Sequence, residues 1–266
     1  MLNILIFSKD RACQLDALLK SLQENMTLPW QAQILYKASN EEYLSGYGLL
    51  KKDYSQNQIN LIPENNFKQN MLDIISSMTG DLLCYMTDDD LLIRPVEDGP
   101  IFDRFKDDPE VLTVSLRLGS NINRCYAGNN ASTPPPVLSN FGYRWQGRGG
   151  DWGYPMSLDG NIFNLQGMVD FLKPIAFSGP NELEGMMHVS RPNKPIMLCF
   201  PQSRLINIPA NRVQDIVANK FHNSCNQKEL NDLYLSGSRI DIKNLYNLEA
   251  NTCHVEVPLP ILAPDK

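Results

Sequence analysis

Long apolar runs are missing from this chain. No apolar stretch approaches the roughly 20 residues that cross a bilayer. The opening MLNILIFSKDRACQ reaches charged side chains too early for a signal peptide. From these two absences we expect a cytoplasmic protein with no transmembrane segment.

Paired cysteines, basic clusters and glycine-rich phosphate loops are missing as well. The six cysteines include no CxxC pair, which predicts reduced structural thiols and no zinc site. The net charge of -6 argues against a nucleic-acid partner, because binding a phosphate backbone needs clustered Lys and Arg. Neither GxGxxG nor GxxxxGK[ST] occurs, which weakens dinucleotide oxidoreductases and P-loop enzymes as interpretations.

What is present in the first half is an alternation of apolar runs with helical stripes. The opening LNILIFS is a continuous apolar run, typical of a strand buried on both faces of a parallel sheet. Leucines at helical spacing follow, until Pro29 ends the pattern. This order predicts an α/β fold built from parallel βαβ units, with helices on both faces of an open sheet. The expected strands are 2–8, 33–39, 59–63, 82–86 and 111–118, and a second amphipathic helix is expected at 67–78.

The second half is less regular. Residues 119–150 are rich in Asn, Gly and Pro, which predicts a long loop, and such loops are usually functional or mobile. Residues 156–164 have the pattern of a hairpin around Asp159 and Gly160. We expect one main domain at 1–200 and a C-terminal extension at 201–266 that packs on it. Further expected elements are a strand at 196–200 and helices at 166–172, 180–187, 212–219 and 227–235.

Three consecutive aspartates, Asp88 to Asp90, follow the expected strand at 82–86. Ligands of open α/β sheets bind beyond the carboxyl ends of the strands, which is where this triplet and the earlier SKDR segment fall. Carboxylates there suit a divalent cation that also holds phosphates. The alternative is a solvated acidic turn or a helix N-cap, since Asp is favoured there too.

The TDDD triplet after the fourth strand, the SKDR segment after the first, and a Trp/Gly/Tyr-rich loop before an acidic helix start resemble the GT-A glycosyltransferases. The resemblance covers about residues 1–200 and is greatest for the large inverting family with a single Rossmann-like domain. It implies a GT-A fold with a mostly parallel central sheet flanked by helices and a C-terminal helical extension. It also implies a nucleotide-sugar donor, a glycan or other hydroxyl acceptor, Mn²⁺ or Mg²⁺, and one catalytic carboxylate.

The resemblance assigns roles to individual residues. Asp88 would lie near the donor ribose, and Asp90 would hold the metal against the diphosphate. The residues that we expect to bind the donor are Ser8, Asp10, Arg11, Ser39, Asn40, Asp88 and Asp89, and the metal ligands that we expect are Asp90, Asp88 and His222. For Asp10 and Arg11 the competing interpretation is a helix N-terminus, where the macrodipole favours Asp.

An inverting transfer needs a carboxylate that accepts the proton of the attacking hydroxyl. PNELEGMM offers Glu184 and Glu182, and we rank Glu184 first, although Asn181 and Glu184 also fit a capping box. Aromatic residues of the middle loop either receive an acceptor sugar or fix the loop to the core. They are Tyr143, Trp145, Trp152 and Tyr154.

Two other functions remain open from the sequence. A sugar-nucleotide pyrophosphorylase shares a nucleotide-binding α/β architecture, but SKDRACQLD lacks the glycine-rich loop that such enzymes carry after the first strand. A GT-A-like protein that binds a nucleotide or a glycan without catalysis is the second alternative, because the base is ambiguous.

Overall fold

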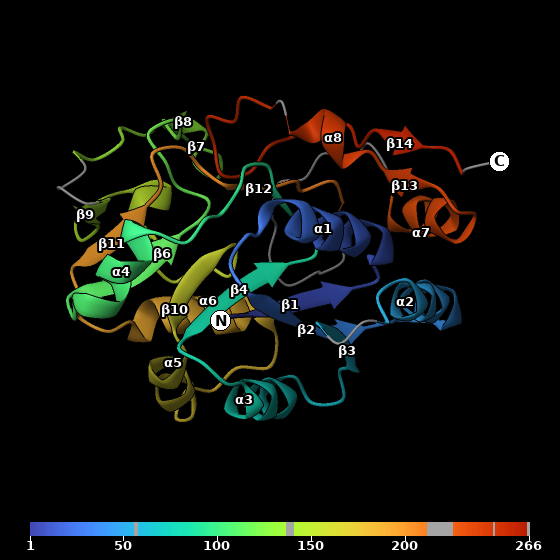
Figure 1. Cartoon of the computed structure of the whole chain (residues 1–266), viewed down its shortest axis with the longest axis horizontal. Helices are drawn as coiled ribbons and strands as arrows, with labels where there is room; N and C mark the ends of the chain where they lie inside the picture. Colours follow the sequence, from blue (N-terminus) through green and yellow to red (C-terminus); the bar gives the residue numbers. More distant parts are fainter. Residues whose placement is uncertain (56–57, 137–140, 212–225, 247, 265–266) are drawn as a thin grey trace.

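A computed structural model describes residues 1–55, 58–136, 141–211, 226–246 and 248–264. An eight-stranded sheet forms its centre, in the order β3-β2-β1-β4-β10-β6-β11-β9, with helices on both faces (Figure 1). The strands in that order are β3 (Ile59–Pro63), β2 (Trp30–Lys37), β1 (Leu2–Lys9), β4 (Leu82–Thr87), β10 (Asn161–Asn164), β6 (Val111–Ser115), β11 (Ile196–Cys199) and β9 (Gly142–Arg144). The expected α/β fold with a mostly parallel sheet is confirmed.

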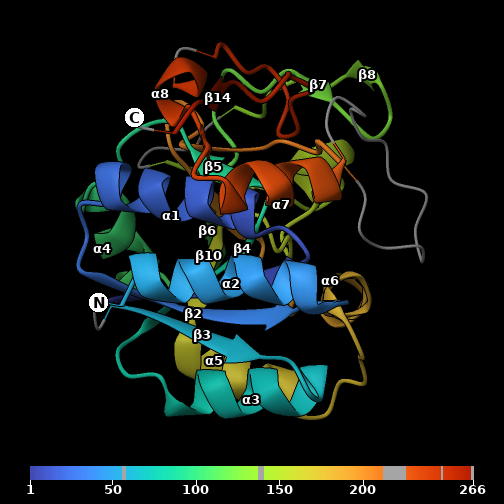
Figure 2. The same ribbon diagram turned by 90° about the vertical axis from the view of Figure 1, so that its right-hand side faces the viewer.

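Alternate residues of β1 supply two separate cores. Ile4 and Ile6 face one apolar cluster and Leu5 and Phe7 the other, and all four are buried. Side chains of α1 (Ala12–Asn25), α2 (Glu41–Asp53) and α4 (Pro100–Asp107) belong to the first cluster. Side chains of α3 (Phe67–Ser77), α5 (Leu165–Leu172) and α6 (Pro180–Ser190) belong to the second, on the other face of the sheet (Figure 2). Burial on both faces explains why β1 is a continuous apolar run rather than an alternating one.

The prediction of a hairpin at 156–164 is wrong. Residues 156–158 form no strand, and β10 runs antiparallel between β4 and β6 instead. The Asp-Gly turn still forms, with Gly160 at a φ of +69°, but it joins the central sheet: Gly160 N–H donates to the Tyr85 carbonyl, and its own carbonyl accepts from Leu116 N–H. A Cβ at Gly160 would lie 2.8 Å from Leu205 Cδ1, so the turn requires glycine.

Two helices in the first half of the chain were not predicted from the sequence. In α2 the buried positions are Tyr43, Gly46, Tyr47 and Leu50, a helical stripe that glycine and tyrosine conceal. Its first turn is capped by Asn40, whose side chain accepts from Tyr43 N–H. The second, α4, begins at Pro100 directly after Gly99.

The region 119–150, expected as loop, contains short regular pieces in its described part. They are β7 (Arg124–Cys125), β8 (Asn130–Ala131), all of β9 and the start of a 3₁₀ turn, η1 (Gly150–Gly153). β7 and β8 form a separate two-stranded sheet.

C-terminal segments pack on the first half of the chain. β12 (Leu205–Asn207) pairs antiparallel with β5 (Asp90–Leu92), which begins at the last aspartate of the triplet. α7 (Gln227–Leu235) lies beside α1 and α2, confirming the helix expected at 227–235 (Figure 2). β13 (Arg239–Ile240), α8 (Ile242–Leu245) and β14 (Ile261–Leu262) complete the chain, with β13 paired to β14. The expected helix at 212–219 lies outside the described residues, and the boundary near residue 201 stays a prediction.

Within the described ranges, none of the helices combines the length and the apolar character that crossing a membrane requires.

A substitution at Gly46 tests the packing of α7 on α1 and α2. A Cβ built there would lie 2.4 Å from Asn231 Oδ1 and 2.9 Å from Ala12 Cβ. We expect Gly46→Ala to lower the free energy of unfolding by about 1–3 kcal/mol through overpacking, measured by urea denaturation.

Gly48→Ala is the matched control, because Gly48 lies in the same helix and a Cβ added there would have nothing within 4 Å. It should stabilise the protein by up to about 1 kcal/mol, the ordinary helix-propensity gain. Equal stabilisation by both substitutions would contradict the packing described here.

Candidate functional site

The chain topology brings polar side chains to one edge of the sheet. β1 and β4 are parallel neighbours, so Asp10 and the triplet that follows Thr87 lie at the same edge. Because β10 runs the other way, its beginning lies at that edge too, and Asp159 just precedes it. Arg117, beyond the end of β6, completes this part of the site.

Arg11 is the cation of the aspartate triplet. Its Nη1 lies 3.0 Å from Asp88 Oδ1 and 2.9 Å from Asp89 Oδ2, and its Nε donates to Asn211 Oδ1 at 2.8 Å. Nη2 also donates to the Asn211 carbonyl. Burial opposes the charge of Arg11, but the two carboxylates outweigh it and raise the pKa of the guanidinium. The Arg11 guanidinium therefore stays charged and is held in one place.

All six carboxylate oxygens of the triplet accept hydrogen bonds from the protein. Asp88 Oδ2 accepts from Lys9 N–H at 3.0 Å, and Asp90 Oδ2 accepts from Thr87 N–H at 2.9 Å. The amide of Asn207, opposite Asp90 in the β5–β12 pair, donates to Asp89 Oδ1 at 2.9 Å and to Asp90 Oδ1 at 3.1 Å. The triplet is thus not a solvated acidic turn.

Burial sets the protonation of two triplet members. Burial raises the pKa of Asp88 to about 6, although the charge of Arg11 acts in the opposite direction. Burial and the charges of Asp159 and Asp89 raise the pKa of Asp90 well above its usual value.

The other residues expected at the donor hold the ends of β1 and β2 together. The Asp10 carboxylate accepts from Ser39 N–H at 2.7 Å and from its hydroxyl at 2.6 Å. Asp10 has a φ of +57°, a conformation that Asp tolerates but that is uncommon outside functional sites and turns. The Ser8 hydroxyl lies 2.7 Å from Tyr47 Oη, whose ring stacks on Tyr36.

Asp159 and His254 were not predicted as site residues. Asp159 Oδ1 lies 3.1 Å from the Thr87 hydroxyl, which also lies 2.9 Å from Asp89 Oδ1. Asp159 Oδ2 lies 3.5 Å from His254 Nε2. Burial alone would raise the pKa of Asp159, but His254 and Arg117 together lower it. The sequence signal was available for Asp159, in the Asp-Gly turn, but not for His254, which reaches the site from the far end of the chain.

Glu184 and Glu182 have different surroundings. Glu184 turns into the site, where its Oε1 accepts from Leu158 N–H at 3.0 Å. Burial and the charge of Asp159 raise its pKa. Glu182 is exposed, and its Oε2 accepts from Ser178 N–H and hydroxyl at 2.8 and 2.7 Å, which closes the start of α6. The capping alternative weighed for Glu184 therefore describes Glu182.

Most of the loop aromatics belong to the core. Tyr143, Trp145 and Trp152 are buried, and the indole N–H groups donate to backbone carbonyls. Tyr154 is partly exposed and stacks on His188 with ring centroids 4.5 Å apart. Only Tyr154 of this group is open to an acceptor.

Among the described residues, no three His, Cys, Asp or Glu side chains are arranged to hold a metal by themselves. Mg²⁺-like ions do not need such a cage, because they bind through one or two carboxylates plus substrate phosphate and water. Asp89 suits this mode: its side chain is 14% exposed, against 4% for Asp88, and carboxylate oxygens can accept more than one contact. His222, the expected histidine ligand, lies outside the described residues.

The fold and the site together define an α/β protein with a carboxylate-rich site at the carboxyl edge of its sheet. No family model and no curated protein matches the chain. Among solved structures it is similar to S. aureus TarS, with 12% identity over 75% of this chain and a TM-score of 0.46.

Two further solved structures are similar at the same level. The mannosyltransferase PcManGT from Pyrobaculum calidifontis, in complex with GDP-Man and Mn²⁺, shares 12% identity over 80% of this chain with a TM-score of 0.49. GalNAc-T7, with UDP, GalNAc and Mn²⁺, shares 9% identity over 77% of this chain with a TM-score of 0.46. The matches span 35%, 58% and 43% of the three proteins, in the order given. These likenesses concern the fold alone.

The Asp159–His254 pair makes stability depend on pH. Burial disfavours the charged imidazole, but the hydrogen bond and charge of Asp159 raise its pKa. The contribution of the Asp159–His254 pair to the free energy of unfolding is therefore fully present below the ordinary histidine pKa of about 6.5. It is lost as the pH rises through the raised pKa of His254 in the folded protein. We expect His254→Gln to cost about 1 kcal/mol of unfolding free energy in acid and less in base, measured by urea denaturation.

His188→Gln is the control, because burial and Arg191 lower the pKa of that histidine and reverse the sign. A His254→Gln effect that grows with rising pH would refute the assignment of this pair.

Proposed function

We propose that the protein transfers a sugar from a nucleotide-sugar donor to an acceptor hydroxyl, with a divalent metal and with inversion at the sugar carbon. The single observation that carries this proposal is the pairing, at one sheet edge, of a cation-held aspartate triplet with a separate, partly buried carboxylate, Glu184. A donor diphosphate needs positive charge, and an attacking hydroxyl needs a proton acceptor. The two parts of the site suit these two needs.

The donor would lie over the ends of β1 and β4. We assign Asp88 to the ribose and Asp89 to the metal, in place of Asp90, because Asp90 is buried whereas the side chain of Asp89 is 14% exposed. When bound, Mn²⁺ or Mg²⁺ would neutralise charge on the diphosphate. Arg11 holds Asp88 and Asp89 in position, and the support for this arrangement is its pair of contacts at 3.0 and 2.9 Å. The predicted ligands Asp90 and His222 stay untested.

Glu184 is the base that we propose. Its carboxylate would accept the proton of the acceptor hydroxyl while that oxygen bonds to the sugar carbon and the carbon–oxygen bond to the diphosphate breaks. A raised pKa favours proton acceptance, since a base is most effective when its pKa is near the working pH. Asp159 is held by His254 and Arg117, which lower its pKa and make it the weaker base.

The alternatives differ from this proposal in identifiable ways. A non-catalytic GT-A-like binding protein would keep Asp88 and Asp89 but would not need a partly buried Glu184 of raised pKa. A pyrophosphorylase would need a glycine-rich phosphate loop after β1, where this chain has Lys9, Asp10 and Arg11. We therefore favour transfer over both.

Glu184→Gln tests the proposed base. We expect it to lower the rate of sugar transfer or donor hydrolysis by about 10²–10⁴, because general-base catalysis is lost. Donor affinity should stay near that of the wild type, since Glu184 lies on the other part of the site. The measurement is turnover of UDP- and GDP-sugars with Mn²⁺, with donor affinity by calorimetry.

Glu182→Gln is the matched control, and it should keep its turnover and most of its stability, because the amide oxygen of Gln can still accept from Ser178. An inactive Glu182→Gln beside an active Glu184→Gln would make Glu182 the base. Full activity in both variants would overturn the proposed mechanism.

A further inference from the structure

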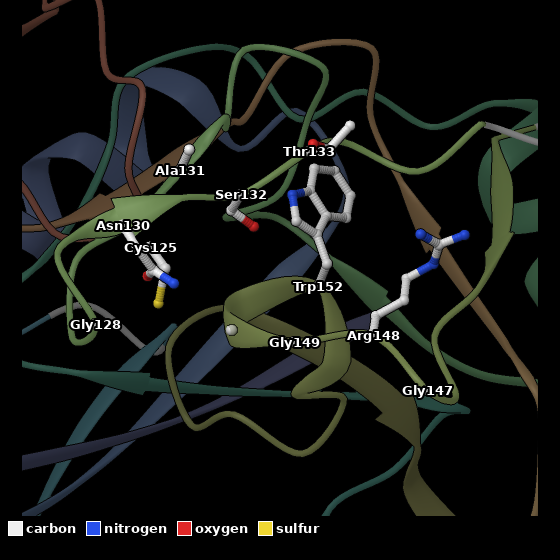
Figure 3. A pocket seen from close by; sticks show the side chains of 11 residues that line it. Cys125, Gly128, Asn130, Ala131, Ser132, Thr133, Gly147, Arg148, Gly149 and Trp152 are labelled. Atoms are coloured by element: carbon white, nitrogen blue, oxygen red, sulfur yellow. The ribbon is translucent and has the colours of Figure 1, made fainter.

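A cavity outside the candidate site lies between the β7–β8 turn and the loop at 147–152 (Figure 3). Its volume is about 510 Å³, within the range of small-molecule pockets, which is about 300–1,000 Å³. Eleven described residues line it; none is acidic, and Arg148 is the one that carries a charge. In a chain with a net charge of -6, such a lining favours an anion.

The backbone and Nε of Arg148 are fixed by its own loop. Its N–H donates to the Trp145 carbonyl at 3.1 Å, and its Nε donates to the Arg144 carbonyl at 2.6 Å. Its carbonyl passes so close to Gly153 that a Cβ there would lie 2.0 Å from the oxygen. Within the described part of the chain, the two terminal guanidinium nitrogens have no hydrogen-bond or ion-pair partner. Arg148 is therefore pre-positioned to bind a phosphate or carboxylate with both of them.

The remaining lining supplies neutral hydrogen-bonding groups and close backbone approach. Asn130, Ser132 and Thr133 contribute an amide and two hydroxyls, and Figure 3 shows Asn130 and Arg148 on either side of Trp152. Gly147 and Gly149 have open space where a Cβ would stand, so a ligand can approach the main chain there.

Two segments that line the cavity are linked to the candidate site through neighbouring residues. Cys125 lines the cavity, and the next residue, Tyr126, stacks on His254 with ring centroids 5.4 Å apart. Asp151 lies between the lining residues Gly150 and Trp152, and its carboxylate lies 2.7 Å from Arg117 Nη1. Two segments that line the cavity thus also carry residues that contact His254 and Arg117.

We propose that this Arg148 cavity binds an anionic group, phosphate or carboxylate, carried by the acceptor. The inference rests on the proposed function, since it names the class of acceptor for that site: a saccharide that bears a negative charge and presents a hydroxyl toward Glu184. A neutral acceptor would leave the charge of Arg148 unused.

Binding without a donor tests the cavity independently of turnover. The probes are glucose 1-phosphate and glucuronate, with glucose as the neutral comparison, titrated into the full chain and followed by amide NMR shifts. We expect saturable binding of at least one anionic probe, and affinity for it lowered about tenfold or more in Arg148→Gln. The two probes distinguish a phosphate from a carboxylate as the recognised group.

Arg144→Gln is the matched control, because it removes the same charge from the same loop region but from outside the lining. The Arg144 carbonyl that holds Arg148 is backbone and remains. Equal loss in both variants, binding of glucose as tight as that of the anions, or no saturable binding by the wild type would each overturn the proposal.

Measuring turnover of nucleotide sugars distinguishes the proposed anion site from the proposed transferase function. If the anions bind through Arg148 but no nucleotide sugar is turned over, the transferase function fails and the anion site stands. If turnover depends on Glu184 but Arg148→Gln changes neither anion binding nor acceptor KM, the acceptor class proposed here is wrong.

Discussion

A buried arginine between two aspartates is the interaction on which the rest of the site depends. Arg11 is 8% exposed, and Asp88 and Asp89 both contact its Nη1. An ion pair at this depth is not a source of net stability, because desolvating the charges offsets their attraction, but removing one partner leaves an uncompensated buried charge. The contacts of Arg11 with Asp88 and Asp89 therefore hold the end of β1 against the end of β4, and loss of either partner would leave the other as an unpaired buried charge.

This constraint leaves the site with two electrostatic halves. On the half at the triplet, one guanidinium contacts two carboxylates, and burial and the neighbouring charges raise the pKa of Asp90. On the other half, Arg117 and His254 hold Asp159 in its charged form, and that charge helps raise the pKa of Glu184. The separation of these carboxylates into stabilised anions and one potential base is the pattern expected of a catalytic site.

Sequence reasoning found the parts of the fold that depend on local patterns. The apolar run of β1, the stripe of α3 and the triplet after β4 were all readable, because periodicity and strand ends are local properties. The path of β10 was not, because an Asp-Gly turn predicts a hairpin and only the competing sheet edges of β4 and β6 decide otherwise. His254 was out of reach for a similar reason: no local pattern records that residues 252–255 lie against Asn207. Choosing between Glu182 and Glu184 needed the direction of each side chain on α6.

The central claim is that the donor's diphosphate and its metal bind at the aspartate triplet. The measurement that tests it most directly is a crystal structure with UDP or GDP and Mn²⁺, in which anomalous scattering locates the manganese. We expect a manganese peak in contact with Asp89 and with the diphosphate, and the ribose beside Asp88. Manganese and nucleotide bound away from the ends of β1 and β4, with the triplet and Arg11 unchanged, would contradict it.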